Sequence, residues 1–310
     1  MLKNGETWYD TEGNTIHAHG GYIINYEGFY YWYGEDRRDN IYVSCYRSKD
    51  LKTWEFRNHV LTTNSPTEGF RIKTHLNLTR PNSEGSEVLK VNIERPKVLY
   101  NEKTKKFVMW AHYENGVDYH RAAIAIASCD KPDGDFVYHG YINPYGYMSR
   151  DCTLFKDDNG DAYFISSSRD NEDMQVYRLA EDYMNVDEHV RTLFQSELRE
   201  APAVFKKDGK YFILTSWCTG WAPNQGTYAY SDKIDGRYSI NENFGDENTF
   251  FSQPAFVLPV EREGVTKYLY FGDRWGGSKE AYFTSTYIVL EIRFDKNGMP
   301  YIEYDEKAAL

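Results

Sequence analysis

The sequence predicts an all-β protein, a five-bladed β-propeller, and three observations lead to this fold class. Aromatic residues make up 17% of the 310 residues, with 28 Tyr among them, and such content favours strands. No stretch repeats its apolar residues with the period of an amphipathic helix. Instead, one unit recurs five times along the chain: a polar residue, a short apolar strand, a turn, and a second strand rich in aromatic residues.

Each recurring unit reads as a β-hairpin whose turn is marked by Gly, Asn or Asp. The first copy, for example, turns at Glu27-Gly28 between two aromatic-rich runs. Successive copies begin roughly 50 to 75 residues apart, which leaves room for two outer strands in each four-stranded blade. A β-sandwich with coincidental hairpins is the alternative. The five predicted hairpins span residues 17–34, 94–110, 151–165, 200–214 and 253–271.

Two further segments complete this interpretation. The polar stretch from Arg57 to Val91 is long for one blade and predicts a loop insertion. The apolar stretch 287–292, followed by a turn at 295–298, predicts outer strands of the closing blade. The five blades then use the whole chain, and we expect a single domain over residues 1–310.

Composition and charge argue against several classes of partner. The formal net charge of -11 disfavours nucleic acid, which needs clustered Lys and Arg. No apolar run approaches the roughly 20 residues of a membrane span. The four Cys are widely spaced and form no C-x-x-C pair, so neither a zinc site nor a disulfide framework is expected. The first residues lack the apolar stretch of a signal peptide, so we expect a cytoplasmic protein, or a secreted one whose leader has been removed.

The start of each predicted inner strand carries a polar residue. In a propeller the innermost strands line a central channel, so residues at their starts converge on one end of it. In chain order these residues are His19, Glu94, Asp151, Glu200 and Gln253. Asp and Glu are depleted in strands, and three carboxylates around a narrow channel repel one another. That electrostatic cost indicates a functional site.

Facing carboxylates are what hydrolysis of a glycosidic bond requires. One must carry a proton near neutral pH and donate it to the glycosidic oxygen, while another stays ionised nearby. Like-charge neighbours supply the upward pKa shift that the donor needs. Because a pocket at the channel mouth accepts only a chain end, the pattern favours an exo-acting enzyme. Trp221 and Trp275, at the exits of two second strands, are candidates for stacking on a sugar face.

The motifs also resemble a known family. The whole chain is similar to glycoside hydrolase family 43, and specifically to its exo-β-1,3-galactanase subgroup. The motifs that carry the resemblance are His-Ala-His-Gly-Gly at 17–21, Glu-Arg-Pro-Lys at 94–97, Glu-Ala-Pro at 200–202 with Gly-Lys-Tyr at 209–211, Thr-Gly-Trp-Ala-Pro-Asn at 219–224, and Gly-Asp-Arg-Trp at 272–275.

The resemblance implies a role for each channel residue. Glu200 matches the general acid, and Asp151 matches the carboxylate that tunes and orients it. Family members usually carry an Asp base at the start of the first blade, whereas this chain has His19 there, as is typical of the subgroup. The resemblance then implies that Gln253 is the base and that Glu94 holds sugar hydroxyls. The other residues expected to bind substrate are His19, Thr219, Trp221, Asn224, Asp273, Arg274 and Trp275.

We therefore expect an inverting exo-acting enzyme that releases galactose from the β-1,3-galactan backbone of arabinogalactan, without an attached carbohydrate-binding module. An α-L-arabinofuranosidase or β-xylosidase on the same fold is the first alternative, and the missing first-blade Asp argues against it. A glycoside phosphorylase would need a basic phosphate pocket, which the channel positions do not provide. A non-catalytic sugar-binding propeller would not need both Glu200 and Asp151. We expect no cofactor or metal to be required; some members of the family that the chain resembles hold a cation in the channel, where His19 would lie near it.

Overall fold

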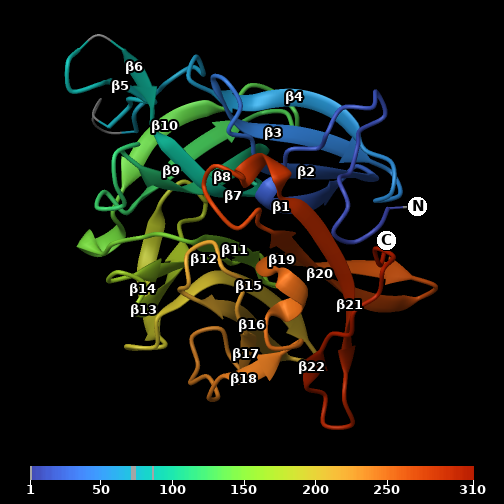
Figure 1. Cartoon of the computed structure of the whole chain (residues 1–310). Helices are drawn as coiled ribbons and strands as arrows, with labels where there is room; N and C mark the ends of the chain where they lie inside the picture. The colour runs from blue at the N-terminus through green and yellow to red at the C-terminus, as the bar shows by residue number, and fades with distance from the viewer. Residues whose placement is uncertain (1, 71–74, 86) are drawn as a thin grey trace.

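The computed structural model describes residues 2–70, 75–85 and 87–310, and its main elements are five four-stranded sheets. Figure 1 shows the sheets arranged around a common centre, with the first strand of each sheet innermost. Within each sheet the strands follow one another in chain order. The predicted all-β fold and five-bladed propeller are therefore confirmed.

The strands have the following bounds. The first blade contains β1 (His19–Tyr26), β2 (Phe29–Glu35), β3 (Ile41–Ser48) and β4 (Glu55–Thr62), and the second contains β7 (Asn92–Asn101), β8 (Lys106–Glu114), β9 (Ala123–Cys129) and β10 (Val137–Ile142). The third contains β11 (Cys152–Lys156), β12 (Ala162–Ser168), β13 (Asp173–Leu179) and β14 (Val186–Leu193). The fourth contains β15 (Arg199–Lys207), β16 (Lys210–Trp217), β17 (Gly226–Ser231) and β18 (Glu242–Phe244). The fifth contains β19 (Gln253–Arg262), β20 (Val265–Arg274), β21 (Thr286–Phe294) and β22 (Pro300–Tyr301). Short 3₁₀ helices η1 (Pro144–Gly146), η2 (Thr249–Phe251) and η3 (Tyr282–Thr284) lie in the connections.

Three of the inner hairpins close with a two-residue turn that ends in Gly. Both residues of each turn have a positive φ, between 50° and 79°. Type I′ turns need this conformation, and their twist matches that of the flanking strands. Glycine reaches it without steric cost, which is why these turns were visible in the sequence. The three turns are Glu27-Gly28, Asp208-Gly209 and Glu263-Gly264.

The apolar core is divided into five clusters, one between each pair of neighbouring blades. Successive side chains of a strand point to opposite faces of the sheet, so each blade contributes to two clusters. In β11, for example, Leu154 packs toward the second blade and Phe155 toward the fourth. Burying one large apolar side chain contributes roughly 1.5–3 kcal/mol. The five clusters together make a rigid ring that fixes the starts of the inner strands.

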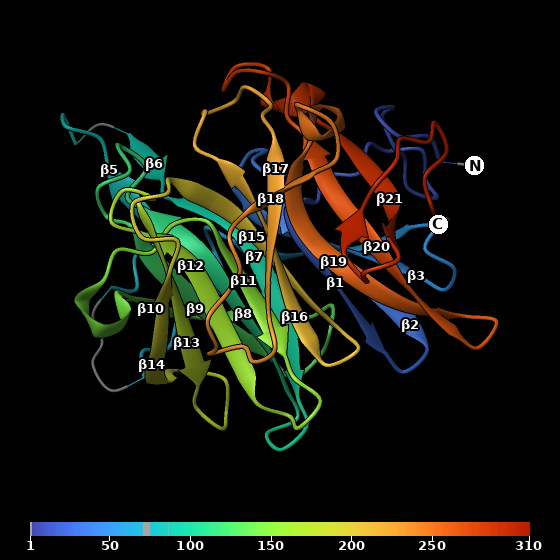
Figure 2. The same cartoon turned by 90° about the horizontal axis from the view of Figure 1, so that it is seen from below.

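Contacts between the N-terminal segment and the fifth blade close the ring. The amide of the buried Asn4 accepts from Val289 N at 2.7 Å and donates to Val289 O at 3.2 Å and Asp305 O at 2.9 Å. Gly5 N donates to Tyr287 O at 2.9 Å. Val289 and Tyr287 belong to β21, so the first residues of the chain hold the third strand of the last blade. The two ends of the chain accordingly lie near each other in Figure 1 and Figure 2.

The predicted insertion is present between the first and second blades. β4 ends at Thr62 and β7 begins at Asn92. Between them β5 (Thr79–Pro81) and β6 (Val88–Lys90) form a small two-stranded sheet, which projects at one edge of the molecule (Figure 2). In the part of the chain that the structure describes, no helix has the length and apolar character needed to cross a membrane.

Candidate active site

The polar residues at the inner-strand starts are aimed by irregularities in the strands that carry them. The pairing register shifts directly after His19, Glu94 and Glu200, and after Pro254 in the fifth blade. Such bulges bend a strand and re-aim its side chains, and they are common beside active sites. In the first three strands the next residue is left-handed, with φ of 55° at Gly20, 50° at Arg95 and 53° at Ala201.

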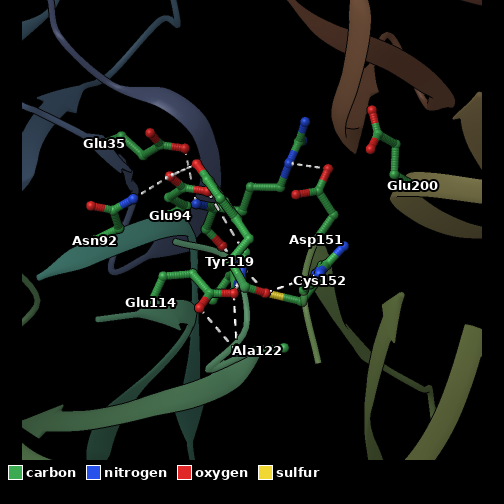
Figure 3. Close-up of polar contacts among 12 residues, drawn as sticks. Glu35, Asn92, Glu94, Glu114, Tyr119, Ala122, Asp151, Cys152 and Glu200 are labelled. Carbon is green, nitrogen blue, oxygen red and sulfur yellow. Dashed lines mark hydrogen bonds and ion pairs between the residues drawn. The ribbon is translucent and has the colours of Figure 1, made fainter. Parts of the chain in front are cut away.

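Four of the five predicted channel residues meet in one cavity of about 360 Å³. Glu94, Asp151, Glu200 and Gln253 line it from the second, third, fourth and fifth blades. Figure 3 shows Glu94 on one side of Asp151 and Glu200 on the other. The fifth channel residue, His19, is buried and does not line the cavity.

Glu200 is the carboxyl group whose surroundings most favour the protonated form near neutral pH. Its Oε1 accepts from Gln253 Nε2 at 2.8 Å, and Asn171 Nδ2 lies 3.4 Å from its Oε2. Burial and the charge of Asp151 raise the pKa of Glu200 to about 7, against the opposing effect of Arg95. A carboxylic acid with such a pKa can donate a proton at neutral pH.

Asp151 precedes β11 and is held by an ion pair and a backbone hydrogen bond. Arg95 Nε lies 2.7 Å from its Oδ2, and Ala201 N donates to the same oxygen at 3.2 Å. Both partners are donors, and hydrogen bonds to a carboxylate stabilise its charge. Ala201 directly follows Glu200, so this bond also ties the strand of Glu200 to the third blade. Asp151 can therefore keep a negative charge close to Glu200.

Gln253 uses every hydrogen-bonding position of its side chain within the protein. Its Nε2 donates to Glu200 Oε1 and to Ser216 Oγ, at 2.8 and 3.0 Å. Its Oε1 accepts from Arg95 Nη2 and, at 2.8 Å, from Trp275 Nε1. A guanidinium and an indole N–H can only donate, so they fix the orientation of the amide. An imidic-acid tautomer would place a proton on Oε1 against two donors, which disfavours it.

A second group of charges surrounds Glu94. Its Oε1 accepts from Tyr119 Oη at 2.7 Å and from Arg37 Nη2 at 3.1 Å, and His112 Nδ1 lies 3.4 Å from its Oε2. Burial alone would raise the pKa of Glu94, but Arg37 and His112 outweigh it and lower that pKa. Glu94 is therefore ionised, and it presents a charged acceptor to the cavity.

The neighbours of Glu94 are themselves paired. Arg37 also bonds Glu35 through Nε at 3.0 Å and Nη2 at 2.9 Å. Burial raises the pKa of Glu35, with Arg37 acting against it. His112 Nε2 lies 2.9 Å from Glu114 Oε1. Burial would lower the pKa of His112, but Glu114 and Glu94 raise it to about 9. The wall on this side of the cavity thus holds alternating charges in fixed positions.

Comparisons with known proteins agree with this geometry. The model of glycosyl hydrolases family 43 matches residues 96–252. A solved β-1,3-galactosidase, in complex with galactodeoxynojirimycin, is 31% identical over 99% of this chain and 99% of its own, with a TM-score of 0.83. The chain belongs to glycosyl hydrolase family 43.

Two further solved relatives are longer than this family 43 chain. An exo-β-1,3-galactanase from Clostridium thermocellum is 42% identical over 98% of this chain, with a TM-score of 0.88, and this chain spans 65% of its length. An exo-β-1,3-galactanase from Phanerochaete chrysosporium, solved with galactose, is 31% identical over 98% of this chain and 67% of its own, with a TM-score of 0.83. No curated protein matches the chain. The predicted family is confirmed.

Two aromatic residues expected to bind substrate do line the cavity of this family 43 chain. Trp221 and Trp275 are among its lining residues, with ring centroids 5.7 Å apart in an edge-to-face arrangement. Trp275 also stacks on Tyr282, at 5.9 Å. Both rings are therefore held in place and can cover a sugar face.

The remaining predicted residues lie outside this cavity. His19 and Asp273 are buried together, with His19 Nδ1 3.0 Å from Asp273 Oδ1. Asn224 bonds Thr219 Oγ1 at 2.7 Å, so these two residues shape the loop that carries Trp221. Arg274 Nε donates to Phe250 O at 2.8 Å, away from the cavity. Asn224 and Arg274 line an adjoining cavity of about 340 Å³ instead.

Sequence reasoning missed several residues of the cavity: Glu35, Arg37, Arg95, His112 and Tyr119. Glu35 and His112 could have been found from the predicted hairpins, because each lies opposite a predicted channel residue. In the strand pairing, Glu35 lies opposite His19 and His112 lies opposite Glu94. The end of each second strand therefore reaches the same rim as the start of the inner strand. Arg37 and Tyr119 lie in loops, and their approach to Glu94 depends on the tertiary fold.

The channel beneath the cavity contains a buried cationic side chain. Lys97 Nζ donates to Gly20 O and, at 3.4 Å, to Arg95 O. Burial lowers the pKa of Lys97 to about 8. Among the described residues, no three His, Cys, Asp or Glu side chains are grouped in a way that could hold a metal ion. That no cofactor or metal is required stays a prediction.

Proposed function

We propose that this chain is an inverting exo-β-1,3-galactanase in which Glu200 is the general acid. The observation that carries the proposal is the pair of unlike carboxyl groups in the cavity. Glu200 is buried and has a pKa raised to about 7, while Arg95 and the Ala201 amide stabilise the charge of Asp151. Acid catalysis of glycosidic cleavage needs this difference between two neighbouring carboxyl groups.

The reaction follows from the arrangement. Glu200 gives its proton to the glycosidic oxygen as the bond from that oxygen to the anomeric carbon breaks, and Glu200 is left as a carboxylate. A water molecule attacks the anomeric carbon from the opposite face, which inverts the configuration, and its proton is released to solvent. A proton from solvent then restores the acid form of Glu200. Asp151 keeps the proton on Glu200 until the leaving oxygen accepts it. The proposed reaction needs no cofactor.

The resemblance assigns activation of the water to Gln253. All four hydrogen-bonding positions of its amide are occupied by Glu200, Ser216, Arg95 and Trp275. Gln253 must therefore exchange one of these partners for the water. Glu94, ionised and facing the same cavity, is proposed to accept hydrogen bonds from sugar hydroxyls.

The proposal for galactan rests on the relatives together with the cavity. The relatives named above are exo-β-1,3-galactanases and a β-1,3-galactosidase. Another structure of the Phanerochaete chrysosporium enzyme, a Glu→Gln variant, contains β-1,3-galactotriose. A cavity of about 360 Å³ at the mouth of the channel suits one terminal sugar, with Trp221 and Trp275 among its lining residues.

A substrate panel tests the specificity. The wild-type protein should release galactose from β-1,3-galactan, and it should act weakly or not at all on aryl α-L-arabinofuranosides and aryl β-xylosides. Preference for either aryl glycoside would transfer the proposal to the corresponding alternative activity. No hydrolysis of any glycoside, with sugar binding retained, would instead indicate a sugar-binding propeller.

Substitution of the acid tests the mechanism. Glu200→Gln should lower kcat on an unactivated β-1,3-galactoside by at least about a hundredfold, the scale of a lost general acid. Glu188→Gln is the matched control, because Glu188 lies on the outer strand β14 with its side chain 55% exposed. Near-normal turnover by Glu200→Gln would remove Glu200 from the role.

A further inference from the structure

Arg95 connects the parts of the site that act on Glu200. Its side chain is buried, and each of its three guanidinium nitrogens has a partner. Nε pairs with Asp151 Oδ2 at 2.7 Å, Nη2 donates to Gln253 Oε1, and Nη1 donates to Pro254 O at 3.0 Å. Asp151 and Gln253 are also the groups that flank Glu200. Among the described residues Arg95 makes no hydrogen bond to Glu200, so it acts on the orientation of the acid through these two residues and on its proton affinity through its charge.

The first connection runs through Gln253 and fixes the orientation of its amide. Arg95 and Trp275 can only donate, so Gln253 must present its oxygen to them and its NH₂ group to Glu200. Without Arg95, Trp275 alone would hold the amide oxygen, and Ser216 Oγ would not oppose a turn of the amide because it can donate as well as accept. The amide would then present an oxygen to Glu200.

The orientation of Gln253 decides which oxygen of Glu200 carries the proton. Oε1 accepts from Gln253 Nε2 at 2.8 Å, and a proton on that oxygen would face the N–H group. The shorter contact at Oε1 therefore favours Oε2 as the oxygen that carries the proton. The contact of Oε2 with Asn171 Nδ2 is long, at 3.4 Å, which leaves this oxygen available to a leaving group in the cavity. Turning the Gln253 amide would move the proton to Oε1, where it would be hydrogen-bonded to the protein.

The second connection runs through Asp151. A charged Asp151 raises the pKa of Glu200, and the positive charge of Arg95 lowers it. The ion pair between Arg95 and Asp151 therefore places opposite charges beside the acid, and their effects on it oppose each other. The other titratable group in contact with Glu200 is the Cys218 thiol, whose pKa burial raises to about 12, so it stays neutral. Arg95 thus sets the charge beside the acid.

We propose that Arg95 is the positioning residue that places the proton of Glu200 on Oε2 through Gln253, while its positive charge offsets the negative charge of Asp151 beside the acid. This inference rests on the proposed role of Glu200 and goes beyond it, because it assigns the acid's orientation to a residue on another blade. It also gives Gln253 a part in aiming the acid, whatever its part in activating water.

The dependence of rate on the leaving group tests the first connection. Arg95→Lys keeps the positive charge but presents one point donor in place of the planar fork. It should lower kcat/KM on β-1,3-galactobiose at least about tenfold, part of the roughly hundredfold contribution of a general acid. On 2,4-dinitrophenyl β-galactoside, whose leaving group needs no proton, the same variant should remain within about twofold of the wild type.

The pH profile tests the second connection. Arg95→Met also removes the charge, so the alkaline limb of kcat/KM should move to higher pH, whereas in Arg95→Lys it should stay near that of the wild type. Arg57→Lys and Arg57→Met are matched controls, because Arg57 is ion-paired with Asp133 at 2.8 Å and Glu55 at 2.6 Å on an outer strand. Neither control should change the leaving-group ratio or the pH limb.

The outcomes separate a positioning role from a structural one. Equal losses on both substrates in Arg95→Lys would overturn the inference, because damage to the fold does not distinguish leaving groups. Should Arg95→Met fail to fold, Arg95→Lys still decides the matter. Wild-type protein in the same assay tests the proposed function separately. If it leaves β-1,3-galactobiose intact, the proposed function fails, and the effect of Arg95→Lys is then compared between the activated substrate and the unactivated glycoside that the protein does hydrolyse. Titration of Glu200 by ¹³C NMR needs no substrate, and an unchanged titration in Arg95→Met would refute the electrostatic part.

Discussion

Replacing Asp151 by Asn should move the pH dependence of the enzyme while leaving its active site assembled. The charge of Asp151 is, after burial, the second cause of the raised pKa of Glu200, which lies at about 7. Asn can still accept the bond from Ala201 N, but it carries no charge. Arg95 would then be unpaired, and its positive charge would lower the pKa of Glu200 further. Both effects act in the same direction.

The expected size follows from these contacts. Loss of one like charge at short range lowers a carboxyl pKa by about one unit or more. At pH 7 the protonated fraction of Glu200 then falls from about one half to about one tenth, so kcat/KM falls about fivefold from this cause alone. At pH 5 Glu200 is protonated in both proteins, and the additional loss disappears.

A pH–rate profile of kcat/KM between pH 4 and 9 on β-1,3-galactobiose measures the shift. Asp158→Asn is the control, because this substitution removes the same charge from an exposed turn, where the Asp158 side chain is 86% exposed. The alkaline limb should move to lower pH in Asp151→Asn only. An unmoved limb, or one that moves to higher pH, would refute the assignment of Asp151 as the group that tunes Glu200.

Three further expectations concern stability. The folded-state pKa of Glu200 lies above its ordinary value of 4.5, so ionisation of Glu200 destabilises the fold as pH rises from 4.5 through 7. Glu200→Gln should therefore melt at least about 2 °C above the wild type at pH 8.5 and show no such gain at pH 4. His112 has a folded-state pKa of about 9 against 6.5, so its stabilisation is complete below pH 6.5 and lost as pH rises through 9. The melting-temperature advantage of wild type over His112→Gln should shrink over that interval, and a constant difference would contradict the charged pairing. Asn4→Ala should lower the free energy of unfolding in urea by about 2–4 kcal/mol, because it leaves Val289 N without its acceptor; Asn297→Ala, on an exposed turn, is the control and should change it by less than about 0.5 kcal/mol.

The fold was predictable because its local signals agree with its topology. The Glu27-Gly28, Asp208-Gly209 and Glu263-Gly264 turns mark hairpins through a conformation that favours Gly. The polar start of each inner strand is visible once the hairpins are aligned. Four of those five polar residues do meet in one cavity, since a propeller brings equivalent positions together.

The rest of the site depends on features without a local signal. Arg95 and Ala201 adopt left-handed φ values of 50° and 53°, a conformation that neither Arg nor Ala favours and that the sequence therefore does not predict. Those bulges turn Glu94 and Glu200 toward the cavity. They also place Arg95 against Asp151 and Gln253, which follow it in the chain by 56 and 158 positions. His19 occupies an equivalent position but is buried against Asp273. The sequence pattern alone cannot distinguish a channel residue that lines the cavity from one beneath it.

The anomeric form of the first product tests the central claim most directly. Proton NMR of a fresh digest of β-1,3-galactan follows the anomeric signals before mutarotation mixes them. If Glu200 donates a proton while water attacks from the opposite face, α-galactose appears first and the β form grows later. β-Galactose as the first product would contradict single-displacement inversion and the assignment of the site that rests on it.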